Sequence, residues 1–146
     1  MKILIVDDEK MIRNVLREYV EFEGNEAYEA EDGLQAVRMC KENDYDLILM
    51  DVMMPGLDGF SAVKEIRKTK DIPVIMLSAR GEEYDKLFGF EVGADDYVTK
   101  PFSPKEVMAR IAAVTKRHRV GSPPSREIVK FEGLEIDMAG RNVYVD

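Results

Sequence analysis

Three short apolar runs, each ending at a polar side chain, constrain the fold of this chain more than any other feature. They lie at residues 2–6, 46–50 and 72–77, and their apolar residues follow one another without alternation. Runs of this kind are typical of strands buried on both faces, as in a parallel sheet. Weaker strands are predicted at 25–30 and 95–98.

Between these strands the apolar residues recur at helical spacing. Asp32 and Ser103 stand where helix N-caps are expected, and Gly24 is placed to end the first helix. The chain therefore alternates strand and helix five times. This predicts an α/β fold with a doubly wound, five-stranded parallel sheet and helices on both faces. The apolar residues at helical spacing include Ile12, Val15, Leu16, Tyr19, Phe22, Leu34, Val37, Cys40, Val107, Ile111 and Val114.

The composition is that of an acidic globular protein. The 146 residues carry a net charge of −8, which disfavours nucleic acid as a partner of the whole surface. Cys40 is the single cysteine, so an internal disulfide is excluded and a reducing compartment is favoured. No apolar run approaches the ~20 residues of a membrane helix, and the N-terminus has no signal-peptide pattern. We therefore expect a cytoplasmic protein with no membrane partner.

The pattern changes near the end of the chain. Residues 120–126 are rich in Gly, Ser and Pro, which is typical of a linker. Residues 127–146 alternate apolar and polar side chains around a turn, which predicts a short antiparallel β segment. A segment of that size cannot hold a core alone. We expect it to be the start of a truncated second domain, although a natural C-terminal extension is the alternative.

Polar side chains that suit phosphoryl chemistry follow the predicted strands. Since ligands of open α/β sheets bind at the carboxyl ends of the strands, we expect these residues to meet at one edge. Three gathered carboxylates repel one another, and a hard cation such as Mg²⁺, which prefers oxygen ligands, relieves this. The lysine can pair with phosphate, and the hydroxyl adds a hydrogen bond. The residues are Asp7, Asp8, Asp51, Ser78 and Lys100.

Asp51 is the best candidate for a nucleophile that forms an aspartyl-phosphate, because it ends the middle strand with acids and a lysine around it. Pro55-Gly56 and Asp58-Gly59 predict a sharp loop after it, which lets a carbonyl near Met53 face the metal. The alternative for any single acid is a structural one: Asp8, for example, favours the start of a helix.

The chain resembles a bacterial two-component response regulator. Residues 1–119 resemble its receiver domain, which implies a flavodoxin-like (CheY-like) fold. Residues 127–146 resemble the opening β-sheet of the winged-helix effector domain of the OmpR/PhoB subfamily. The motifs that carry the resemblance are Asp7-Asp8, Asp51-x-x-Met54-Pro55-Gly56-x-Asp58-Gly59, Ser78-Ala79, Gly93-Ala94-Asp95-Asp96-Tyr97 and Lys100-Pro101-Phe102.

The resemblance implies a phosphorylation site with a magnesium cofactor. Asp51 would accept a phosphoryl group from a phosphohistidine of a sensor histidine kinase. Asp8, Asp51 and the carbonyl of Met53 would ligate Mg²⁺ directly, and Asp7 would act through a water.

The resemblance also implies a switch in which three residues respond to the phosphoryl group. Lys100 would contact that group, Ser78 would move to hydrogen-bond it, and Tyr97 would turn inward. The Lys100-Pro101 bond is expected to be cis, as in the family.

Phosphorylated relatives in this subfamily pair through the fourth helix, fifth strand and fifth helix, which implies a homodimer here. We expect Lys86 to pair with Glu106, and Asp96 with Arg110, across a twofold axis. A solvated helix face is the alternative, since exposed ion pairs contribute only ~0–1 kcal/mol. The charged residues expected at the interface are Lys86, Asp95, Asp96, Glu106, Arg110 and Arg117.

Three functions compete for these residues. The first is a phosphoacceptor switch that controls transcription through an absent C-terminal DNA-binding domain. It would not be an enzyme beyond its own phosphorylation and dephosphorylation. The second is a Mg²⁺-dependent phosphohydrolase with an aspartyl-phosphate, but such enzymes carry Asp-x-Asp after the first strand. The third is a flavin- or nucleotide-binding module, which would need a Gly-rich or Ser/Thr-rich loop where acids stand. The spacing favours the switch.

Overall fold

The computed structural model describes residues 1–78 and 93–121, with side chains as far as Arg117. The chain divides into two compact units, Met1–Thr115 and Lys116–Asp146. Of the second unit, the structure describes only the residues that continue the last helix. The predictions for Lys86 and for the β segment at 127–146 lie outside the described residues. Of the linker predicted at 120–126, residues 120 and 121 belong instead to the last helix (Pro104–Gly121), and 122–126 lie outside the described residues.

Five parallel strands form one sheet, as predicted, and the structure shows their order to be β2-β1-β3-β4-β5. The strand order reverses direction between β1 and β3, and ligands of doubly wound sheets bind at such a switch point. The strands are β1 (Lys2–Val6), β2 (Glu26–Ala30), β3 (Leu47–Asp51), β4 (Val74–Ser78) and β5 (Asp96–Thr99).

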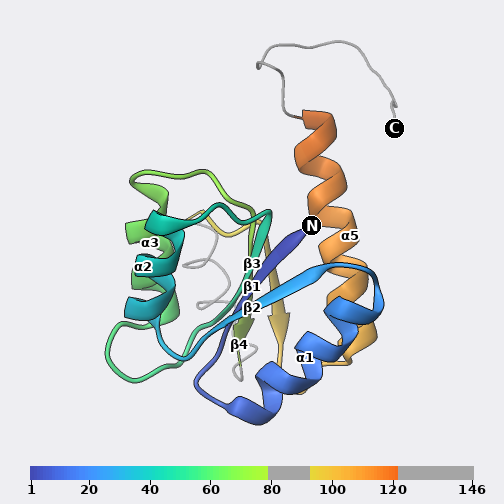
Figure 1. The fold of residues 1–146 in the computed structure, drawn as a ribbon, viewed down its shortest axis with the longest axis horizontal. Helices are drawn as coiled ribbons and strands as arrows, with labels where there is room; N and C mark the ends of the chain where they lie inside the picture. The colour runs from blue at the N-terminus through green and yellow to red at the C-terminus, as the bar shows by residue number, and fades with distance from the viewer. Residues whose placement is uncertain (79–92, 122–146) are drawn as a thin grey trace. The chain divides into compact units, whose positions relative to one another are not determined.

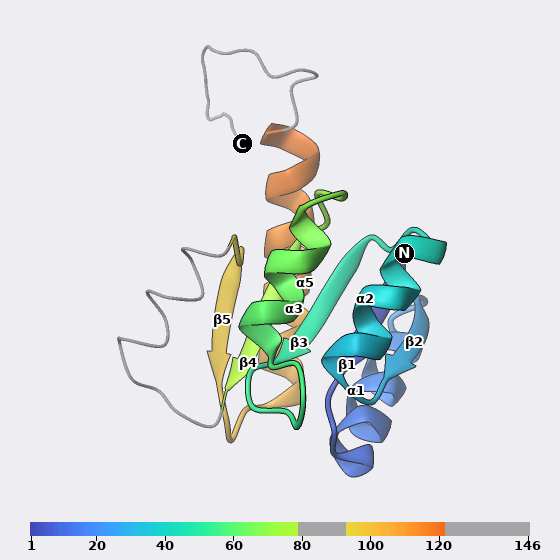
Figure 2. The same cartoon turned by 90° about the vertical axis from the view of Figure 1, so that its left-hand side faces the viewer.

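Helices cover both faces of the sheet. Figures 1 and 2 show α2 and α3 together on one face, with α1 and the start of α5 on the other. The bounds are α1 (Lys10–Phe22), α2 (Gly33–Glu42), α3 (Gly59–Arg67) and α5 (Pro104–Gly121). This arrangement confirms the doubly wound α/β prediction.

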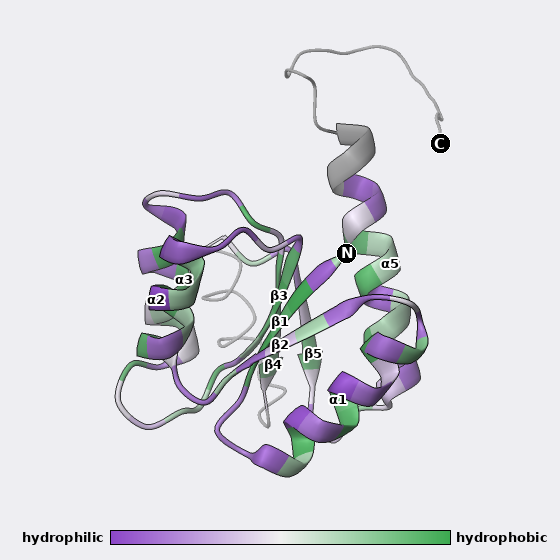
Figure 3. Cartoon of the chain, viewed as in Figure 1, coloured by the Kyte–Doolittle hydropathy of each residue, from purple (hydrophilic) through white to green (hydrophobic). Residues whose placement is uncertain are grey.

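The three central strands, β1, β3 and β4, are largely apolar because each face of the sheet has its own core. Successive residues of β1 alternate between the two cores: Ile3 and Ile5 pack with α1 and α5, and Leu4 and Val6 pack with α2 and α3. None of these side chains is exposed to solvent. Burying one such side chain stabilises the fold by roughly 1.5–3 kcal/mol. Figure 3 shows the hydrophobic strands between helices that carry hydrophilic outer faces.

The orientation of α1 differs from the one that the apolar spacing suggests. Its buried residues are Arg13, Leu16 and Val20, whereas Val15 is 37% exposed and Phe22 87% exposed. A charged residue thus occupies a core-facing position, where the Arg13 guanidinium bonds the Asp7 carbonyl and the Glu29 carboxylate.

The helix boundaries follow the predicted caps, with one correction. The Asp32 carboxylate accepts a hydrogen bond from the Gln35 N–H at 2.8 Å, and Gly24 has a φ of +86° after the end of α1. The correction concerns Asp58 and Gly59, which were predicted to form part of a loop. The Asp58 carboxylate accepts the Ser61 N–H at 2.8 Å, so Asp58 caps α3 and Gly59 is the first residue of that helix.

Cys40 provides a test of the packing between α2 and the sheet. Its side chain is 2% exposed, and burial raises the pKa of the thiol to about 11. Because the thiolate is the reactive form, we predict that the folded protein resists alkylation at pH 8. Alkylation followed by mass spectrometry should show no adduct until urea unfolds the chain. Rapid labelling of the folded protein would contradict this packing.

Candidate functional site

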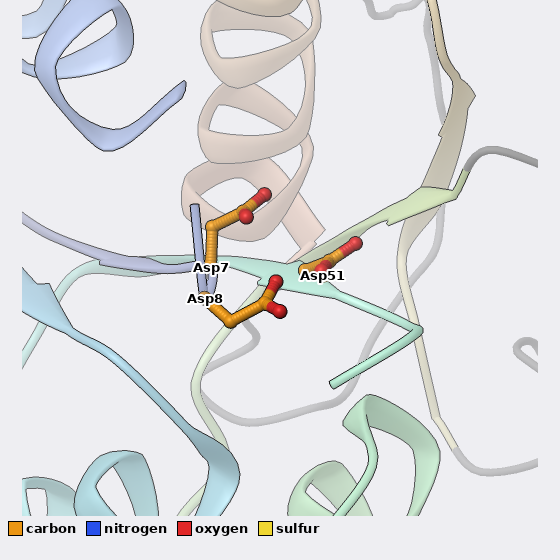
Figure 4. A group of neighbouring side chains, drawn as sticks. All are labelled: Asp7, Asp8 and Asp51. Carbon is orange, nitrogen blue, oxygen red and sulfur yellow. The ribbon is translucent and has the colours of Figure 1, made fainter. Parts of the chain in front are cut away.

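Three carboxylates meet at the carboxyl edge of the sheet. Asp7 and Asp8 follow β1, and Asp51 ends the neighbouring β3. Their carboxylate oxygens lie within 4.8 Å of one another. Figure 4 shows the three side chains extending from these strand ends in the same general direction. Asp7 and Asp51 are buried and Asp8 is exposed, so the group opens to solvent on one side.

Lys100 bridges the two buried carboxylates. It directly follows β5, and its Nζ atom lies 3.2 Å from both Asp7 Oδ2 and Asp51 Oδ1. Its backbone N–H donates to the Ser78 carbonyl, and the Lys100–Pro101 peptide is cis, as expected. The predicted gathering of residues from the ends of the first, third and fifth strands is therefore confirmed.

The electrostatics of the site leave negative charge in excess. Burial, followed by repulsion from Asp7, raises the pKa of Asp51 to about 7, although Lys100 opposes the rise. Burial also raises the pKa of Asp7. Burial alone would lower the pKa of Lys100, but attraction by Asp51 and Asp7 outweighs it and the net pKa is raised. One ammonium thus compensates for two buried carboxylates and a third carboxylate at the opening.

This donor set fits a hard divalent cation. Mg²⁺ takes oxygen ligands and keeps several waters, and the exposed Asp8 leaves an open side for them. The structure offers three carboxylates within ligand distance of one ion and no soft ligand among them. The residues present therefore fit the Mg²⁺ that the sequence predicts.

Close backbone approaches hold the loop after β3. A Cβ atom at Gly59 would lie closer to the Asp51 carbonyl than any van der Waals contact, and one at Gly33 would overlap the Leu57 carbonyl. The Gly59 N–H donates to the Val52 carbonyl at 2.9 Å. These contacts seat the loop against the end of β3, and Met53 within it is 53% exposed.

The two predicted switch residues lie in the strands beside this edge. Ser78 ends β4 and has no exposed surface. Tyr97 is on β5 in register with Met76, and its side chain is buried in the core on the α2 and α3 side. Both belong to the half of the sheet that supplies Lys100.

The described residues of the predicted dimer interface make contacts within one chain. Arg110 Nη1 lies 3.0 and 3.1 Å from the two Asp96 oxygens, and its Nη2 lies 3.4 Å from Glu106. The Asp95 carboxylate accepts the Val74 N–H at 2.8 Å and contacts Arg67 at 3.2 Å. Arg117 lies on α5, in the second unit. Pairing across a twofold axis stays a prediction.

The sequence reasoning missed Arg13 and Glu29, which support the acid edge. Arg13 donates to the Asp7 carbonyl at 2.8 Å and to Glu29 at 2.9 Å. The signal was present in the spacing, because Arg13 precedes Leu16 and Val20 by three and seven residues. A charged residue at the core-facing positions of a helix indicates a buried partner.

Residues 3–112 match the family of response regulator receiver domains, and the chain belongs to that family. The part of the chain that the structure describes contains no helix that is both long and apolar enough to span a membrane.

Relatives of known sequence and structure agree with the family. The chain is 43% identical over 150 residues to the transcriptional regulatory protein SrrA of Staphylococcus aureus, covering 99% of this chain and 62% of that protein. It is similar to the receiver domain of the Francisella response regulator 1452 (TM-score 0.75, 41% identity, 80% of this chain and 97% of that one). It is also similar to the BeF₃-activated DrrB receiver domain (TM-score 0.73, 32% identity, 80% and 97%).

The raised pKa of Asp51 predicts a pH-dependent stability in metal-free protein. The folded state keeps this carboxyl protonated up to about pH 7, whereas its ordinary value is 3.8. Its contribution to the free energy of unfolding is therefore complete below pH 4 and is lost as the pH rises through 7. We predict that Asp51→Asn raises the free energy of unfolding at pH 8 by about 1–3 kcal/mol, and by less at pH 5.

Urea unfolding at both pH values without divalent cations checks this prediction. Asp58→Asn is the matched control, because an exposed N-cap position accepts either residue. The control should leave the stability nearly unchanged. An equal effect of Asp51→Asn at pH 5 and pH 8 would show that its charge is not the cause.

Proposed function

We propose that this chain is a phosphorylation-activated switch of a two-component system, with Asp51 as the phosphoacceptor for a sensor histidine kinase. The observation that carries the proposal is the buried Asp51 carboxylate, bridged to Lys100 at 3.2 Å and grouped with two further acids at the switch point of a receiver fold. A carboxylate in this setting is able to act as a nucleophile toward phosphorus.

The transfer itself follows from this geometry. The bond between phosphorus and the kinase histidine nitrogen breaks as a bond to an Asp51 carboxylate oxygen forms, and the histidine ring leaves with the electron pair. Lys100 is placed to offset charge on the phosphoryl oxygens. We assign Asp8, Asp51 and the Met53 carbonyl as direct Mg²⁺ ligands, and Asp7 as a ligand through water. When bound, the ion supplies positive charge that the single lysine lacks.

The switch requires a group whose contacts change when the Asp51 carboxylate becomes an acyl phosphate. Lys100 now bonds both Asp7 and Asp51, and an added phosphoryl group would compete for its ammonium. Ser78 ends the adjacent strand and is assigned to hydrogen-bond that group, and Tyr97 is assigned to follow it. Such differential contacts shift the balance between two conformations.

An exposed apolar stripe on α1 supports a protein phosphodonor. Met11 is 78% exposed and Phe22 87%, and with Val15 they fall on one side of the helix. Glu18, Tyr19 and Phe22 line a hollow of about 300 Å³. Because α1 starts directly after the Asp7-Asp8 segment, a kinase that docks on this stripe lies beside the acid edge. Exposed apolar patches of this kind are typical of interaction sites.

The output we propose is control of transcription in the cytoplasm, by a member of the OmpR/PhoB subfamily. The chain spans 62% of the length of the S. aureus regulator, and the match extends through the residues after the receiver domain. We assign 1–119 to the receiver domain, the residues between the end of α5 at Gly121 and residue 127 to the linker, and 127–146 to the start of a DNA-binding effector domain. Phosphorylation would promote a homodimer, and DNA would bind only through the remainder of that domain.

An intact-mass measurement tests the phosphoacceptor. We predict that a small-molecule phosphodonor with Mg²⁺ adds one phosphoryl group per chain, that the adduct is lost in base, and that Asp51→Asn abolishes it. Asp58→Asn should be phosphorylated as the wild type is. Release of many phosphates per chain with no adduct would instead indicate a phosphohydrolase.

A light-scattering measurement tests the output. We predict that beryllofluoride with Mg²⁺ raises the dimer fraction, and DrrB supports the choice of this phosphoryl mimic. Dimer formation would require Arg110 to release Asp96 of its own chain for the same residue of the partner. Arg110→Gln should then weaken dimerisation without preventing phosphorylation. A mass that stays monomeric in the presence of the mimic would contradict the proposed dimer.

A further inference from the structure

Arg13 is a buried cation next to the acid edge that the proposed phosphotransfer does not use. Arg13 is only 7% exposed, because it lies on the buried face of the amphipathic helix α1. A buried guanidinium is costly unless its donors are satisfied. Arg13 Nη1 donates to the Asp7 carbonyl at 2.8 Å, and its Nε donates to Glu29 Oε1 at 2.9 Å. It thus connects α1 and β2 to Asp7, the first acid of the site.

The bond to Asp7 acts on the peptide that joins the first two acids. The Asp7 N–H donates to the Ala30 carbonyl at 3.2 Å, so this residue is already tied to β2 on one side. Arg13 holds its carbonyl on the other side. Because a peptide unit is planar, the direction of the Asp7 carbonyl also sets the direction of the Asp8 nitrogen and Cα. The Arg13 contact therefore acts on the backbone of both acids, in addition to the Glu9 N–H, which donates to Asp7 Oδ1 at 2.9 Å.

Glu29 keeps Arg13 in this place. Its second oxygen accepts a hydrogen bond from Arg17, so one carboxylate spans two guanidinium groups. Burial would raise the pKa of Glu29, but the hydrogen bonds and charges of Arg17 and Arg13 outweigh burial and the net pKa is lowered. Arg13 is thus paired with a carboxylate that is ionised at neutral pH. Its influence on the acid edge comes from a directed hydrogen bond.

We propose that Arg13 is a positioning residue for the metal and phosphoryl site: by holding the Asp7–Asp8 peptide it aims both carboxylates at Asp51. This inference rests on the proposed function, since it concerns how the same site binds Mg²⁺. Removing residues that orient metal ligands typically lowers metal affinity 10-fold to 100-fold. Arg13 reaches the site through a backbone carbonyl, so its loss should weaken Mg²⁺ binding even though it contacts no ligand atom of the ion.

Arg17 offers a matched control within the same cluster. It also lies on α1 and also bonds Glu29, but its other hydrogen bond goes to Glu21, whereas that of Arg13 goes to the Asp7 carbonyl. Arg17→Gln therefore removes the same charge and a bond to the same carboxylate while the Asp7 carbonyl keeps its donor. Arg13→Met removes both donors at similar side-chain length. Arg13→Lys keeps the charge but lacks the planar fork that spans two acceptors.

The first measurement is Mg²⁺ affinity by titration calorimetry on the full chain, with Mg²⁺ alone as the ligand. We expect Arg13→Met to weaken binding at least 10-fold, Arg13→Lys to weaken it less, and Arg17→Gln to stay within twofold of wild type. Urea unfolding establishes which variants are folded under these conditions. If Arg13→Met does not fold, Arg13→Lys carries the comparison, with at least a threefold loss expected.

The second measurement separates positioning from general destabilisation. The rate of phosphorylation by a small-molecule donor is followed against Mg²⁺ concentration. Positioning predicts that the Mg²⁺ concentration for half-maximal rate rises in the Arg13 variant by the same factor as the dissociation constant. A double-mutant cycle with Asp8→Asn should be non-additive, because Arg13 acts in part through Asp8.

The outcomes distinguish this inference from the function on which it rests. A folded Arg13 variant that binds Mg²⁺ within twofold of wild type overturns the positioning role and leaves the phosphoacceptor intact. So does an equal loss of affinity in Arg17→Gln. A wild-type protein that neither binds millimolar Mg²⁺ nor takes a phosphoryl group would overturn the proposed function, and the role of Arg13 with it.

Discussion

Repulsion among carboxylates at one edge of the sheet is the constraint on which the rest of this structure depends. Two of the acids, Asp7 and Asp51, are buried, and a single ammonium lies 3.2 Å from each. Such a site is unfavourable for an isolated protein, because buried charge is costly unless it is compensated. The same imbalance makes it a receptor for positive charge and for a phosphoryl group that arrives with a cation. The acid site therefore lowers the stability of the fold at the same place where we propose that it binds a cation and a phosphoryl group.

The fold tolerates this arrangement because its surroundings are rigid. The strands that carry the acids are buried on both faces and pack into two separate cores. The loop after β3 is seated by Gly59 against the Asp51 carbonyl, and the segment after β1 is tied to β2 and to Arg13. Carboxylates that repel one another would separate if their backbones were free to move. Hydrogen bonds to the peptide groups oppose this separation, and Lys100 bridges the two buried side chains.

Much of the fold and of the site could be predicted from the sequence, because both depend on local patterns. Uninterrupted apolar runs identify strands of a parallel sheet, and polar residues directly after them must meet at its carboxyl edge. The pairing of distant charges could not be predicted in the same way. The place of Asp95 at a dimer surface stays a prediction, but the contacts of its carboxylate with the Val74 N–H and with Arg67 within one chain were not predicted. The sequence offers each carboxylate many possible cationic partners, and only the three-dimensional path of the chain decides which of them lies beside it.

The sequence by itself determined the alternation of strand and helix, the acids at the strand ends and the lysine that meets them, since short-range hydrophobic spacing and strand direction suffice for these. Only the tertiary structure decided which face of α1 is buried, that Arg13 lies beneath it, and that Phe22 stays exposed. The reason is that the rotation of a helix on a sheet reflects the sum of its contacts. A guanidinium that satisfies a backbone carbonyl and a carboxylate can outweigh the burial of one apolar side chain.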